Sequence, residues 1–134
     1  MTDDQPILGN PPLRRTSPLA VAVRLAFLAA IAAIVGAIFL PPPVVPDFVQ
    51  SPYLQHFAAF YVAALLALAA LPRAPVVRLF IGFMLFAALL EGSRILVGGR
   101  PAVLQDNWVA DVGGVAAAMV PAVVERFRSR LRRG

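Results

Sequence analysis

The sequence of 134 residues contains no cysteine, no lysine and a single histidine, and only 14% of its residues are charged. The absence of cysteine excludes disulfides, thiolate catalysis and cysteine-ligated metals. The single histidine, His56, excludes a metal site built from several histidines of one chain, so we predict no metal and no cofactor. Hydrophobic residues make up 60% of the chain. A water-soluble domain of this size cannot bury that much apolar surface, and a disordered chain would not carry it.

Four apolar runs make up most of the sequence, and breaks rich in proline or glycine separate them. As helices they would be roughly 26–33 Å long, close to the hydrocarbon thickness of a bilayer. A signal peptide is the weaker interpretation of the first run, because the run is too long for a signal-peptide core and three prolines follow it. We therefore predict an all-α integral membrane bundle of four transmembrane helices, at residues 19–40, 53–71, 76–97 and 108–126, with a short loop at residues 102–107.

The basic residues indicate the orientation of these helices. All twelve are arginines, and four spans place every one except Arg94 and Arg100 on the side of the two chain ends. Because arginine-rich segments stay in the cytoplasm, both termini are predicted to be cytoplasmic. Residues 1–18 would form a flexible tail, residues 19–126 the membrane domain, and residues 127–134 a basic tail that contacts anionic lipid. We expect no binding of nucleic acid.

Small residues recur at every fourth position in three of the runs. The repeats are Ala29, Ala33 and Ala37; Ala59, Ala63 and Ala67; and Gly114 and Ala118. Small residues at this spacing let helices approach closely in lipid. An alanine-rich composition also produces such repeats by chance, so both interpretations stay open.

Polar residues gather in the half of the protein that lies opposite the chain ends. Glu91 lies six residues inside the end of its run, about 9 Å deep, where an unpaired charge is unfavourable. Arg94 follows at i+3 on the same face, either as a structural partner or as part of an outward-facing pocket. His56 lies about one turn inside its run. It could bond a neighbouring helix, act as a general base, or bind an anionic head group when protonated.

Further polar residues precede and enter the last run. Asn107 and Asp111 are four residues apart and share a helix face, whereas Asp106 lies on another side. Two acids and an asparagine in six residues exceed what a helix cap needs. Arg100 follows two glycines and suits bidentate contact with a carboxylate or phosphate, with Asp106 as the alternative partner. The candidate ligand-binding residues are His56, Glu91, Arg94, Arg100, Asp106, Asn107 and Asp111.

The order of these residues resembles that of the VanZ-like family, which consists of small bacterial multi-pass membrane proteins. The resemblance spans residues 53–118 and lies in His56-Phe57-x-x-Phe60, Glu91-x-x-Arg94, Gly99-Arg100, Asp106 and Ala110-Asp111-x-x-Gly114. Three departures stand out. Pro52 and Tyr53 replace an aspartate and a lysine, and Arg94 replaces a glutamine. The last motif also has one residue too many, so that either Asn107 takes the place of the family's aspartate or the acid has shifted. The resemblance implies the fold and a place in the cell envelope, and it implies no mechanism.

We therefore expect an integral protein of the bacterial inner membrane that binds a lipid head group, a lipid-linked glycan or a glycopeptide at an outward-facing polar cluster. Membrane lipids are its expected partners, and an oligomer is compatible with the sequence. Two alternatives stay open: an intramembrane hydrolase or transferase with His56 as its base, and a structural or small oligomeric transport protein. No nucleophile motif supports the enzyme, since Ser93 stands alone, so no catalytic residue is assigned.

Overall fold

Four helices make up the structure, a computed structural model that describes residues 16–40, 51–98 and 101–133, without the side chains of residues 101–104. They are α1 (Pro18–Phe39), α2 (Pro52–Ala70), α3 (Val76–Leu96) and α4 (Pro101–Leu131). Each contains a segment long and apolar enough to cross a membrane. The predicted all-α fold with four such helices is confirmed.

The first two helices begin at a serine followed by a proline. The hydroxyl of Ser17 accepts a hydrogen bond from the amide of Ala20 at 3.2 Å, and Pro18 occupies the first turn. Ser51 and Pro52 repeat this arrangement at the start of α2. Serine satisfies a free amide of the first turn, and proline has no amide to satisfy there. These starts lie within one residue of the predicted ones. The predicted tail at residues 1–18 lies mostly outside the described residues.

The fourth helix is longer than predicted, because it begins at Pro101 and not near Trp108. The residues predicted as a short loop, 102–107, are helical. Proline favours the first turn of a helix, and the polar residues after it lower the hydropathy without breaking the helix. With 31 residues, α4 is about 46 Å long, more than a bilayer core needs. Its basic end therefore extends beyond the apolar layer.

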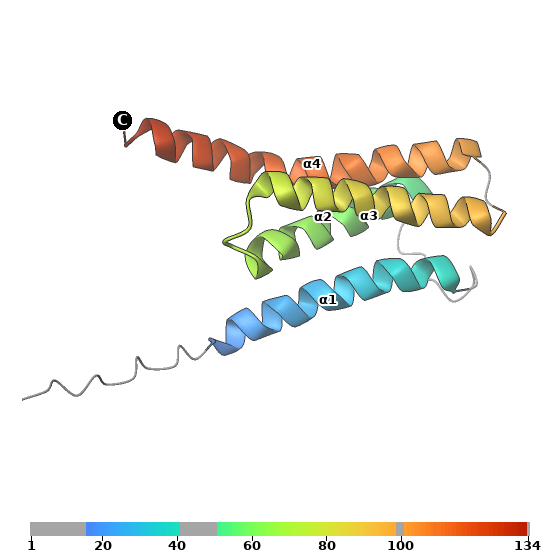
Figure 1. Cartoon of the computed structure of the whole chain (residues 1–134), viewed down its shortest axis with the longest axis horizontal. Coiled ribbons are helices and arrows are strands. Elements are labelled where there is room, and N and C mark those ends of the chain that lie inside the picture. The colour runs from blue at the N-terminus through green and yellow to red at the C-terminus, as the bar shows by residue number, and fades with distance from the viewer. Residues whose placement is uncertain (1–15, 41–50, 99–100, 134) are drawn as a thin grey trace, which may run out of the picture.

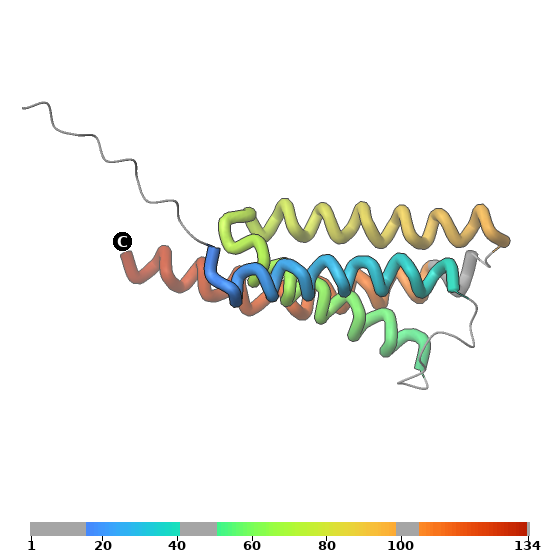
Figure 2. Tube along the Cα trace, turned by 90° about the horizontal axis from the view of Figure 1, so that it is seen from below, coloured from blue at the N-terminus to red at the C-terminus, as the bar shows by residue number. Residues whose placement is uncertain are grey.

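Helices α2, α3 and α4 pack together, and α1 lies along one side of them (Figure 1, Figure 2). The most extensive contact joins α2 and α4. None of the residues of α1 is buried, and its Phe27, Ala30, Ile31 and Ile34 are partly buried against the core. The buried core residues are Phe60, Ala63, Ala64, Ala67, Val76, Phe83, Ala87, Val115, Ala118 and Met119.

The backbones of α2 and α4 approach each other closely at Gly114. A Cβ atom at this position would overlap the carbonyl oxygen of Phe57 and lie 3.0 Å from the amide nitrogen of Tyr61. A Cβ atom on the neighbouring Gly113 would meet only the ring of Phe57, at 3.5 Å, which is ordinary contact. The separation of α2 and α4 therefore depends on a residue without a side chain at position 114.

The small-residue repeats contribute unequally to packing. Ala63, Ala67, Gly114 and Ala118 are buried between helices, as close helix packing requires. In contrast, Ala59 and two of the three alanines in the repeat on α1 are exposed. Close packing through small residues is thus a property of α2 and α4, whereas the repeat on α1 follows from its alanine-rich composition.

Large apolar side chains cover the outside of the bundle. Leu28 on α1 is 60% exposed, and Leu85 and Leu89 on α3 are 61% and 72% exposed. Such a surface is unfavourable in water and matches the acyl chains of a lipid bilayer. By the length and hydropathy of its helices, the chain is a multi-pass membrane protein. The start of α1 and the end of α4 lie at the same end of the bundle (Figure 1).

Candidate functional site

The antiparallel order of α2, α3 and α4 brings three ionisable side chains together at one end of the bundle. His56 lies in the second turn of α2, Glu91 near the end of α3, and Asp111 in the first half of α4. One ligand atom from each of these side chains lies within 4.8 Å of those of the other two. We call these three residues the polar cluster.

A direct interaction joins two members of the polar cluster. The Nδ1 atom of His56 lies 2.9 Å from Oδ1 of Asp111, so a protonated Nδ1 donates a hydrogen bond to the carboxylate. This bond fixes the orientation of the imidazole ring and leaves Nε2 on its other side. Among the described residues, this pair is the only one within ion-pair distance.

The two carboxylates of the polar cluster are almost fully buried. Glu91 is 6% exposed and Asp111 is 1% exposed. The side chain of His56 is 20% exposed, so the cluster is reached from the surface of the bundle at this ring. The site is therefore enclosed by the three helices on the side of the carboxylates and open on the side of the histidine.

Each of the two carboxylates has one oxygen that lacks a partner. Oε2 of Glu91 and Oδ2 of Asp111 are buried and accept no hydrogen bond from any residue that the structure describes. A buried acceptor without a donor destabilises a protein by about 1–3 kcal/mol, and by more when it is charged. Two such atoms in one cluster are available to accept a hydrogen bond from a donor or to bind a cation.

Asn107 is a further buried polar residue beside Glu91. It is 5% exposed, and its side chain lies next to the Glu91 carboxylate, close enough to donate a hydrogen bond. Asn107 and Asp111 face the same side of α4, as their spacing predicts. Asp106 is exposed on another side of the helix, also as predicted, and it lies away from the polar cluster.

A direct ion pair between Glu91 and Arg94, one of the two interpretations of these residues, is not among the described contacts. Arg94 is half-buried and acts on Glu91 electrostatically, but no described ion pair joins the two within 4.0 Å. One carboxylate oxygen of Glu91 lies within 4.8 Å of a carboxylate oxygen of Asp111 on α4. Arg100, the remaining predicted site residue, lies outside the described residues.

One feature of the site was not predicted from the sequence. The pairing of His56 with Asp111 was not predicted, because two separate motifs do not reveal how their helices are rotated. The close approach at Gly114, one turn after Asp111, positions this pair. The signal that could have revealed it is the small-residue repeat that begins at Gly114 and continues at Ala118.

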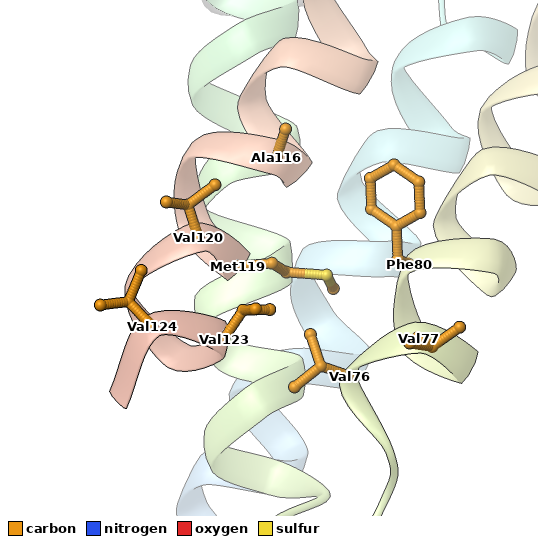
Figure 3. A pocket seen from close by; sticks show the side chains of 8 residues that line it. All are labelled: Val76, Val77, Phe80, Ala116, Met119, Val120, Val123 and Val124. Atoms are coloured by element: carbon orange, nitrogen blue, oxygen red, sulfur yellow. The ribbon is translucent and has the colours of Figure 1, made fainter. Parts of the chain in front are cut away.

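A separate apolar cavity lies between α3 and α4, in the half of the bundle that contains the start of α3 (Figure 3). Its volume is about 280 Å³. Its lining residues are Val76, Val77, Phe80, Ala116, Met119, Val120, Val123 and Val124. This cavity is open to the surface of the bundle, and no polar side chain lines it.

No protein family, curated protein or solved structure matches the chain. The helices of the chain alone therefore define its class, which is a four-helix, multi-pass membrane protein with a buried polar cluster.

Proposed function

We propose that the protein is a VanZ-like protein of the bacterial inner membrane that binds the polar head of a lipid, a lipid-linked glycan or a glycopeptide at the polar cluster. The observation that carries this proposal is the pair of buried carboxylate oxygens without partners, beside a histidine that is reached from the surface.

The chemistry of the polar cluster selects for ligands that donate hydrogen bonds. Glu91 and Asp111 offer free acceptor atoms, so hydroxyl groups of a glycan or an ammonium group of a lipid head would satisfy them. Arg94, half-buried beside Glu91, supplies one positive charge for an anionic part of the same ligand. A molecule with both hydroxyl or ammonium groups and a phosphate fits this combination.

The depth of the polar cluster supports a ligand held at the membrane boundary. Glu91 lies five residues before Leu96, the end of α3, or about 7.5 Å along the helix axis. This depth lies just inside the hydrocarbon core, close enough to its boundary for a lipid head group to reach. The excess of arginine at the opposite end favours the outer leaflet for this site.

Lipids that co-purify with the protein test the proposal. Native mass spectrometry would compare the wild type with Asp111→Asn and with the matched control Asp106→Asn, which changes an exposed aspartate on the same helix. We expect retention of a polar-headed ligand to fall at least about tenfold in Asp111→Asn, the effect of losing one charged hydrogen bond. The control should retain the ligand. Equal retention in all three proteins would contradict the proposal.

A second candidate function rests on the contact between His56 and Asp111. An imidazole that donates from Nδ1 to a buried carboxylate is oriented for Nε2 to act as a general base. This arrangement suits a hydrolase or transferase that activates water against a lipid-linked substrate. The hydroxyl of Ser93 donates to the carbonyl of Leu90 within α3, so Ser93 is not supported as the nucleophile. Product formation from lipid-linked substrates that disappears in His56→Gln would favour this candidate.

A further inference from the structure

The polar cluster combines three features of a metal site. It offers one imidazole and two carboxylates, these groups come from three different helices, and their ligand atoms lie within 4.8 Å of one another. The two buried oxygens without partners, on Glu91 and Asp111, are a second indication that this constellation can accept a positively charged ligand. We propose that His56, Glu91 and Asp111 bind a divalent transition-metal ion. This proposal rests on the proposed function, because the polar cluster is also the site that receives the polar-headed ligand.

The distances are compatible with such an ion. Metal–ligand bonds to imidazole nitrogen and carboxylate oxygen are about 2.0–2.2 Å long, which places the ligand atoms about 3.4 Å apart in a tetrahedral site and about 2.9 Å apart at a right angle. The Nδ1 atom of His56 and Oδ1 of Asp111 are 2.9 Å apart. The ion would take the place of the proton between these two atoms, and that proton would leave to water. Glu91 then needs a side-chain shift of about 1 Å to complete the set.

The charge balance favours an ion over a neutral ligand. With both carboxylates ionised and the imidazole neutral, the polar cluster carries a charge of about −2, and Arg94 beside Glu91 offsets only one unit of it. The remaining negative charge is unfavourable inside a bundle surrounded by lipid. A divalent cation offsets this charge and lies close to both oxygen atoms that lack a donor. One imidazole with two carboxylates suits Zn²⁺ or Mn²⁺ better than the all-oxygen sites of Ca²⁺ and Mg²⁺.

A three-residue site leaves at least one coordination position open. In proteins, such a position is filled by water or by a ligand oxygen. The exposed side of the site is the side of His56, so a phosphate oxygen of a lipid head group could reach the ion from there. Bound in this way, the ion would explain how an acidic cluster holds an anionic head group.

Metal binding by the full-length protein in detergent tests the proposal. The protein is stripped with EDTA, dialysed and titrated with Zn²⁺, and bound zinc is measured by calorimetry and elemental analysis. We expect one ion per chain and a rise in the unfolding temperature of about 5 °C or more at saturating zinc, because the ion links three helices. The variants Glu91→Gln and Asp111→Asn should bind at least about 100-fold more weakly, and Asp106→Asn should bind as the wild type does. No stoichiometric zinc, or equal weakening in Asp106→Asn, would overturn the proposal.

A second measurement on the wild type avoids any dependence on the folding of variants. Cobalt(II) replaces zinc and reports its ligands through visible d–d absorption. We expect a spectrum typical of mixed nitrogen and oxygen ligation that zinc abolishes by competition. The spectrum of hydrated Co²⁺ alone would overturn the proposal.

Lipid retention with and without EDTA separates this inference from the proposed function. Stoichiometric metal together with EDTA-sensitive lipid retention supports both. Stoichiometric metal without a retained polar lipid supports the metal site and contradicts the proposed function. Retention of the lipid by a protein that binds no metal supports the proposed function and overturns the metal site.

Discussion

The contact between α2 and α4 at Gly114 makes a sharp prediction, because the neighbouring glycine is its control. In Gly114→Ala, the new methyl group would overlap the backbone of Phe57. The atoms that it meets belong to the backbone, so no side chain can turn away. Restoring ordinary contact requires the helices to separate by about 1 Å. The expected loss of stability is about 1–3 kcal/mol, as for other overpacked sites.

The same separation acts on the polar cluster. His56 precedes Phe57 on α2, and Asp111 lies one turn before Gly114 on α4. Adding about 1 Å to the 2.9 Å between Nδ1 of His56 and Oδ1 of Asp111 breaks their hydrogen bond. Gly114→Ala should therefore lower both the unfolding temperature in detergent and the retention of the polar-headed ligand.

The control for this prediction is Gly113→Ala. Its methyl group meets the Phe57 ring at 3.5 Å, and alanine favours a helix over glycine by up to about 1 kcal/mol. The control should unfold at or above the wild-type temperature and retain the ligand. If Gly114→Ala unfolded at the same temperature as Gly113→Ala, the argument from the close approach of α2 and α4 would be refuted.

Two further predictions concern the core and the orientation. Phe60→Ala removes a buried ring that packs against Phe83. Because lipid is as apolar as the core, the loss of stability comes mainly from the cavity that is left, of about 100 Å³. We expect the free energy of unfolding in detergent to fall by about 2–3 kcal/mol. The control Val62→Ala, at a residue that is 50% exposed, should change stability by far less, and equal losses would contradict this reasoning. Because the chain has no cysteine, Val97→Cys and Ser129→Cys each introduce a unique thiol for an impermeant reagent. In intact cells Val97→Cys should react and Ser129→Cys should not, and the reverse pattern would refute the predicted orientation.

The helices were predictable where a local signal marks both the span and its start. Hydropathy located α1, α2 and α3, and the serine–proline pairs at Ser17 and Ser51 account for the starts of the first two. The start of α4 was missed because hydropathy reports the apolar part of a helix and not its polar extension. Pro101 was interpreted as a break between elements, whereas it occupies the first position of the helix.

The sequence predicted part of the polar cluster and not the pairing within it, since Asp106 lies away from the cluster. The antiparallel order of the spans places His56, Glu91 and Asp111 at the same end of the bundle, and the four-residue spacing places Asn107 with Asp111. How each helix is rotated about its axis depends on packing between helices, which no local pattern specifies. This is why the sequence offered Arg94, on the same helix, as one possible partner of Glu91 and did not indicate Asp111, which lies near Glu91 in the structure.

The central claim is that the polar cluster receives a ligand and does not merely hold the helices together. Glu91→Gln tests it most directly, because glutamine keeps the shape of the side chain and removes its charge. Unfolding temperature and ligand retention would be measured in the same detergent preparation, beside the wild type. The account predicts a metal-free variant that unfolds within a few degrees of the metal-free wild type and retains little or no polar-headed ligand. A metal-free variant that unfolds far below the metal-free wild type, or a variant that retains the ligand in full, would contradict it.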